Sequence, residues 1–175
     1  IRDRTVDSVK ICMEDYPDVN WLIPIQGHFN DYQSLLKSLE MYEEMGVLDR
    51  YDYYAVANIC TVRKAKPQVE AIKTVHRFFE EKGRRARLHV FGMRIRTIPY
   101  VKDILYSFNS VTYTKPICKK LRDRYPHSAK NTYQRILFFC CFMENLHRRY
   151  GLVYPSETRE ACYALVWKEL AELCM

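Results

Sequence analysis

The stretch YYAVANIC at residues 53–60 decides the fold, together with three stretches of the same kind. These are WLIPIQG at 21–27, LHVFG at 88–92 and FNSVTY at 108–113. Each is a short apolar run that ends in a small or polar residue, which is typical of strands buried on both faces of a parallel sheet. The carboxyl ends of such strands carry the functional site. We therefore expect four strand-end residues to converge: Gln26, Asn58, Gly92 and Asn109.

Amphipathic helical patterns separate these runs. One helix is expected to begin at a capping box of Asn30 and Gln33 and to end at Gly46. A second runs from Pro67 to Gly83, and a shorter one follows Pro99. The strands recur at the ~30 residues of a βαβ unit, so right-handed crossovers and an α/β fold are predicted.

The alternation ends near Pro116. Residues 118–124 are basic, Ser128 is placed to cap a long helix that ends at Tyr150, and Pro155 opens a last helix. We therefore predict two parts: an alternating domain at 1–116 and a helical C-terminal extension at 117–175.

Composition limits the classes of function. The chain has 175 residues, and no apolar run approaches the ~20 residues of a membrane helix, so no membrane partner is expected. Seven cysteines without a CxxC pair indicate reduced thiols and a cytoplasmic protein. The net charge of +7 favours an anionic partner, of which nucleic acid is the commonest.

The motifs IPIQG, YAVANIC, LHVFG and SFNSVTYTKP, in this order, resemble the second half of the tRNA-guanine transglycosylase barrel. The nearest members are the archaeosine-type and DNA-modifying deazaguanine enzymes, and the resemblance covers about residues 20–116. It implies that 1–116 is part of a TIM-type barrel with parallel strands. It also implies exchange of a guanine or 7-deazaguanine base in RNA or DNA.

The family's base-binding positions fall on Gln26, Gly27, Ala57, Asn58, Phe91 and Gly92. Gln26 matches the glutamine that hydrogen-bonds the base, and a primary amide can both donate and accept there. Phe91 matches an apolar residue that stacks on the base. Ala57 and Asn58 depart from the pattern, because the family has two glycines at these positions.

Asn109 matches the aspartate nucleophile of the family, which attacks the sugar and forms a covalent intermediate. An amide carries no charge and is a poor nucleophile. Three interpretations stay open: the asparagine was introduced to trap a complex, the protein binds without catalysis, or another carboxylate acts. Asp103 is the nearest such carboxylate.

The family's zinc-binding cysteines have no counterpart in the C-terminal part. That part offers Cys118, the adjacent Cys140 and Cys141, His127 and His147. Adjacent cysteines on a helix point about 100° apart and do not suit one tetrahedral ion. We therefore expect core thiols, no metal and no cofactor.

The first half of the family's barrel, with its general acid/base aspartate, is not in this sequence. We expect a fragment of a longer protein, with a minimal or split relative as the alternative. A half barrel has two exposed edges. An N-terminal barrel half, a homodimer partner or the C-terminal helices would have to cover them.

Basic residues are expected to bind phosphates beside the strand ends. They are Arg63, Lys64, Arg94, Arg96, Lys119 and Lys120, whereas KGRRAR at 82–87 precedes a strand and belongs at the opposite end. Three functions follow: a base-exchange enzyme, a nucleic-acid-binding protein without catalysis, or an unrelated α/β enzyme that holds a phosphorylated small molecule with Arg94 and Arg96.

Overall fold

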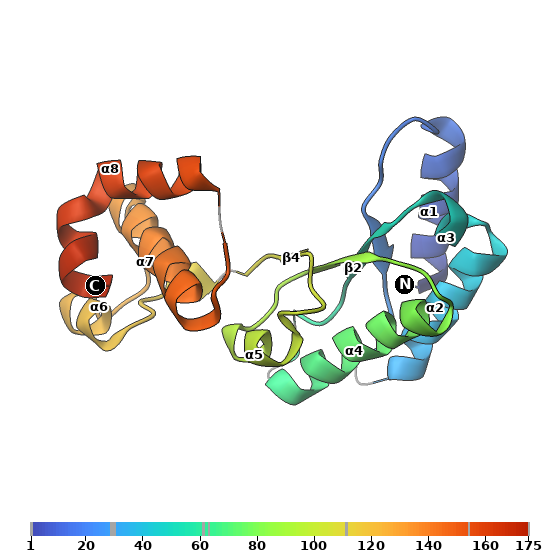
Figure 1. Ribbon diagram of the computed structural model, residues 1–175, viewed down its shortest axis with the longest axis horizontal. Helices are drawn as coiled ribbons and strands as arrows, with labels where there is room; N and C mark the ends of the chain where they lie inside the picture. Colours follow the sequence, from blue (N-terminus) through green and yellow to red (C-terminus); the bar gives the residue numbers. More distant parts are fainter. Residues whose placement is uncertain are drawn as a thin grey trace. The chain divides into compact units, whose positions relative to one another are not determined.

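The computed structural model describes residues 2–28, 31–60, 62, 64–110, 112–153 and 155–174. It divides into two compact units, Ile1–Ser110 and Val111–Met175, so the division falls before the expected boundary at 116. Figure 1 shows the first unit in blue to yellow-green and the second in gold to red. No helix in the described parts is long and apolar enough to cross a bilayer.

The first unit alternates helices and strands. Its elements are α1 (Arg2–Asp15), β1 (Ile23–Ile25), α2 (Tyr32–Glu44), α3 (Val47–Arg50), β2 (Tyr53–Val56), α4 (Ala65–Glu81), β3 (Arg87–Val90), η1 (Ile95–Thr97), α5 (Ile98–Val101) and β4 (Ser107–Phe108). The four strands form one parallel sheet in the order β1-β2-β3-β4. The predicted α/β class and parallel sheet are confirmed.

The sheet is open, with β1 and β4 at its two edges. Closure into a small barrel takes about eight strands, so these four do not form the closed TIM-type barrel. The last strand is also shorter than expected, because Thr112–Thr114 is a 3-10 turn, η2, rather than a continuation of β4.

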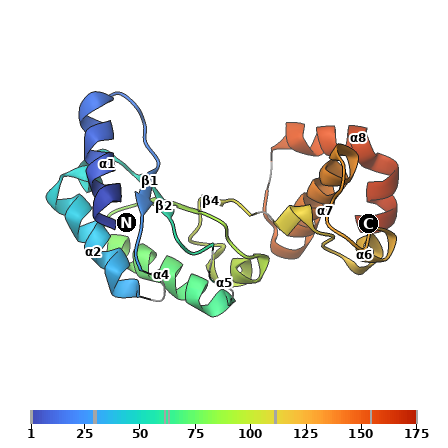
Figure 2. The same ribbon diagram turned by 180° about the vertical axis from the view of Figure 1, so that it is seen from behind.

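The register places Ile25, Val56 and Val90 on one face of the sheet, where all three are fully buried. The amphipathic helices α2 and α4 bury Leu39 and Ile72 in the same core. In Figures 1 and 2, α2, α4 and α5 lie along the same side of the strands. One face of the sheet is therefore built for helix packing.

The helix starts differ from the sequence prediction in three places. Asp31, rather than Asn30, caps α2, because its carboxylate accepts from the N–H groups of Gln33 and Ser34; Asn30 itself lies outside the described residues. Helix α7 (Thr132–Tyr150) is capped by Asn131 rather than Ser128. Helix α1 was not expected at all.

The second unit consists of η2, α6 (Lys119–Arg124), α7 and α8 (Ser156–Cys174). Helices α7 and α8 pack on each other and share a buried cluster that includes Leu137, Phe138, Val166 and Leu170. The expected helical C-terminal part is present.

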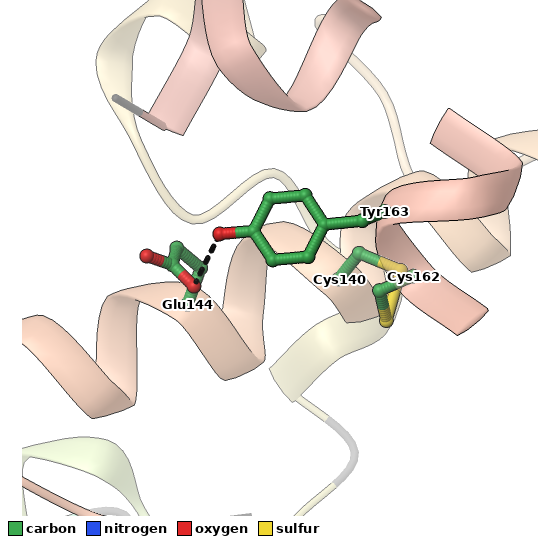
Figure 3. The surroundings of a disulfide bond; sticks show 4 residues. All are labelled: Cys140, Glu144, Cys162 and Tyr163. Atoms are coloured by element: carbon green, nitrogen blue, oxygen red, sulfur yellow. Dashed lines mark hydrogen bonds between the residues drawn. A yellow bond between two sulfur atoms is a disulfide. The ribbon is translucent and has the colours of Figure 1, made fainter. Parts of the chain in front are cut away.

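A disulfide joins Cys140 of α7 to Cys162 of α8 (Figure 3). The prediction that all cysteines are reduced thiols is therefore wrong for this pair. Cys140 and Cys141 are buried as expected, and Cys141 is not in a disulfide. Adjacent cysteines point in different directions from a helix, so the first can face α8 while the second packs elsewhere.

A buried carboxylate lies near the disulfide on α7. Glu144 pairs with Arg148 one turn later, at 2.9 Å, and accepts a hydrogen bond from the Tyr163 hydroxyl of α8 at 3.5 Å (Figure 3). Buried charges require such partners. The disulfide and this polar contact both connect α7 to α8.

Candidate functional site at the carboxyl end of the sheet

The carboxyl ends of all four strands lie on the same side of the sheet, because the strands are parallel and adjacent in order. Gln26 and Gly27 follow β1, Asn58 follows β2, Gly92 follows β3 and Asn109 follows β4. Two side chains join neighbouring loops: the amide nitrogen of Asn58 donates to the Gly27 carbonyl at 3.3 Å, and the Asn109 Oδ1 accepts from the Gly92 N–H at 2.5 Å. The structure thus joins Asn58 to Gly27 and Asn109 to Gly92, whereas the Gln26 side chain bonds Thr5 of α1 instead.

The side chain of Gln26 is held in one orientation. The Thr5 hydroxyl on α1 donates to its Oε1 at 2.9 Å, and its main-chain carbonyl accepts from the Ser38 hydroxyl at 2.5 Å. The side-chain nitrogen has no hydrogen-bond partner among the described residues. Its two N–H groups are therefore the donors that this end of β1 can offer to a ligand.

Asn58 has a positive φ of 61°, the left-handed region that asparagine tolerates better than other residues with a Cβ. The Asn58 side-chain amide holds the loop after β2 against Gly27. Ala57 before it is buried and donates its N–H to the Ile25 carbonyl.

Asn109 is tied to β3 and its turn by three hydrogen bonds. Its N–H donates to the Val90 carbonyl, its carbonyl accepts from the Met93 N–H, and its side chain accepts from Gly92. This amide therefore fixes the turn after β3. Asp103 lies in the turn before β4, at the amino end of the sheet, so it is not placed to act in its stead.

Phe91 is half-buried, and its ring meets the His89 imidazole edge-on with centroids 4.8 Å apart. The Nδ1 of His89 hydrogen-bonds the Ser107 hydroxyl at 2.8 Å. Burial lowers the pKa of His89 below its ordinary value, which leaves the imidazole neutral at pH 7. The ring that packs beside Phe91 is therefore a neutral imidazole that Ser107 holds by a hydrogen bond.

Gln68 is a buried residue that supports the candidate site and that the sequence prediction missed. This buried amide on α4 donates to the Ile59 carbonyl at 2.8 Å and accepts from the Arg94 N–H at 3.1 Å and the Thr97 hydroxyl at 2.9 Å. It joins the loops after β2 and β3. A polar residue beside Val69 on the apolar stripe of α4 is the one sequence signal that pointed to it.

The basic residues differ between the two ends of the sheet. Lys64, Arg94 and Arg96 are exposed in the loops after β2 and β3, and none forms an ion pair within the described part of the chain. At the amino end, Lys82, Arg84 and Arg87 pair with Glu43, Asp49 and Asp52. Among the residues that the structure describes, three basic residues at the amino end are therefore neutralised and Arg85 beside them is not, whereas all three at the carboxyl end keep their charge unpaired.

Three of the predicted phosphate-binding residues do not belong to this group. Arg63 lies outside the described residues, and Lys119 and Lys120 belong to the second unit. Lys120 also donates to the Glu172 carbonyl there.

Arg94 is partly committed to its own loop, because its Nε donates to the Val62 carbonyl at 2.9 Å. Its guanidinium is therefore less free to bind a ligand than that of Arg96. This weakens the idea of a two-arginine clamp on one phosphate.

Within the described ranges, no three His, Cys, Asp or Glu side chains gather closely enough to hold a metal ion. Comparison with known family models, curated proteins and solved structures found no match for this chain. The transglycosylase resemblance therefore stays a prediction based on the four strand-end motifs.

Proposed function

We propose that this chain is a transglycosylase-like nucleic-acid-binding protein that holds a guanine or 7-deazaguanine base at the carboxyl end of its sheet. The observation that carries the proposal is the Gln26 amide, whose oxygen is held by Thr5 while its nitrogen keeps two free donors. A ring carbonyl of a guanine-type base accepts such donors, whereas adenine presents an amino group at the same place.

The strand order supports the finer fold assignment as well. Successive βαβ units that pair in sequence order, with their helices along the same side, are what one part of a β/α barrel contains. We therefore propose that the first unit is part of a TIM-type barrel, whose remaining strands lie in another segment or in another copy of the chain.

Binding without catalysis is the function we favour, because Asn109 is an amide that already holds the turn after β3. Base exchange is the second candidate. It is supported by the place of Asn109 directly after a strand, together with the sequence resemblance that aligns Asn109 with the family's nucleophile.

Replacement of Asn109 by aspartate separates the two candidates. A carboxylate can accept the same Gly92 N–H, so the fold should persist. We expect neither the wild-type chain nor Asn109→Asp to form a covalent adduct with guanine-containing RNA or DNA, as measured by denaturing electrophoresis and mass spectrometry. An adduct with the aspartate variant would establish the base-exchange candidate instead.

Polymer binding is expected to depend on the unneutralised charge at the carboxyl end. Arg96→Ala should weaken binding of a single-stranded oligonucleotide similarly for all sequences, since phosphates carry no sequence information. It should also flatten the log–log salt dependence by about 0.7 for each phosphate that the variant no longer neutralises. Fluorescence anisotropy at several salt concentrations measures both effects.

Arg85→Ala is the matched control, because Arg85 is equally an exposed arginine but precedes β3 at the amino end. We expect it to leave the affinity and the salt slope close to those of the wild type. Equal losses from the two variants would mean that a diffuse basic surface binds the polymer.

A further inference from the structure

A hollow of about 490 Å³ lies between α1 and β1, apart from the loops that follow β2, β3 and β4. Its volume is within the range of small-molecule sites. The residues that line it are Arg4, Thr5, Ser8, Val9, Cys12, Trp21, Leu22, Ile23, Pro24 and Gln26.

The lining is polar at one end and apolar along the rest. Thr5 and Gln26 form a hydrogen bond with each other at the polar end of the hollow. Arg4, which precedes Thr5 on α1, lines the same end. Cys12 lies on α1 about 10 Å from Thr5, at roughly 1.5 Å per residue of helix. Trp21, at the other end of the β1 segment, donates its indole N–H to the Tyr16 carbonyl at 3.3 Å, which fixes the ring.

The edge of β1 is unsuited to an added strand, although it is an edge of the sheet. Pro24 has no N–H, its carbonyl accepts from the Tyr42 hydroxyl at 2.7 Å, and the Gln26 carbonyl accepts from Ser38. A strand needs such groups free for pairing. The occupant is therefore a small molecule rather than a polypeptide strand.

The chemistry of the two ends defines that molecule. Arg4 makes no ion pair within the described residues, and the Gln26 nitrogen has free donors, so the polar end attracts an anionic group with acceptor oxygens. The Val9, Leu22 and Ile23 side chains offer an apolar wall that favours a hydrocarbon or aromatic body.

We propose that the α1–β1 hollow binds an elongated amphipathic carboxylate, with its head at Arg4 and Gln26 and its apolar body extending toward Trp21. This inference does not rest on the proposed base recognition, although Gln26 serves both. Trp21 and the free thiol of Cys12 both line the hollow, so each can report whether a ligand occupies it.

The test titrates decanoate into the full chain carrying Trp167→Phe, which leaves Trp21 as the sole tryptophan of the two. We expect a saturable change in Trp21 emission as decanoate binds. Arg4→Ala should lower the affinity for decanoate about tenfold, because a charge-assisted hydrogen bond is lost. Lys10→Ala, a cation on α1 outside the hollow, should bind decanoate as the parent does. Decylamine, with the opposite head charge, should give no saturable change.

Alkylation by iodoacetamide provides the second readout. Decanoate should slow the reaction of Cys12 and leave the exposed Cys60, in the loop after β2, unaffected. The proposal is overturned if Arg4→Ala and Lys10→Ala bind alike, if decylamine binds as well as decanoate, or if Cys12 is unprotected at saturation.

Discussion

Gly92→Ala is expected to destabilise the first unit by about 3 kcal/mol, from left-handed backbone strain and overpacking together. Gly92 has a φ of 64°, and a Cβ at this position would collide with the Cβ of Cys60 in the loop after β2. The backbone N–H of Gly92 donates a hydrogen bond to the side-chain oxygen of Asn109. Because three strand-end loops meet at this glycine, base binding should be lost as well. Urea denaturation followed by circular dichroism measures the stability.

Gly83→Ala separates the two causes. Gly83 has nearly the same φ, 65°, but a Cβ there would meet nothing within 4 Å. Only the backbone strain applies, so the expected loss is about 1 kcal/mol, without an effect on ligand binding. If both alanine variants lost the same stability, the close approach of the loops after β2 and β3 would be refuted.

Reduction of the Cys140–Cys162 disulfide is expected to destabilise the second unit by about 3 kcal/mol, as the chain-entropy model gives for a closed loop of this size. The bond spans a sequence separation of 22 and joins the two long helices of that unit. Thermal unfolding with and without dithiothreitol should show a lower melting temperature for the reduced second unit and no change in the first.

The double variant Cys140→Ala/Cys162→Ala provides the control, since it lacks the bond in both conditions. It should melt near the temperature of the reduced wild type, and dithiothreitol should not lower it further. An unchanged melting temperature of the wild type on reduction would contradict a stabilising role for the bond.

The sheet was predictable from local sequence because its signal is local. The apolar runs around Ile25, Val56 and Val90 are buried strand interiors, and the stripes of α2 and α4 match their packing faces. The strand ends follow from the same pattern, so the sequence alone places Gln26, Asn58, Gly92 and Asn109 on one edge of the sheet.

Partners distant in sequence could not be predicted in this way. Gln68 is one polar residue in an apolar helix, and its three hydrogen bonds exist only after the loops around Ile59 and Arg94 fold against it. The Cys140–Cys162 pair likewise depends on how α8 returns along α7. Helix α1 has a weak amphipathic pattern, and its packing on α2 depends on contacts between segments distant in sequence.

The claim that Gln26 reads a guanine-type base is tested most directly with two single-stranded oligonucleotides that differ at one position, guanine in one and adenine in the other. Fluorescence anisotropy should show that the wild type prefers the guanine strand by about tenfold, within the ~1–3 kcal/mol of a well-made base contact. Gln26→Ala should remove the preference, and Gln33→Ala, an exposed glutamine on α2, should retain it. Equal affinity of the wild type for both strands would contradict the account.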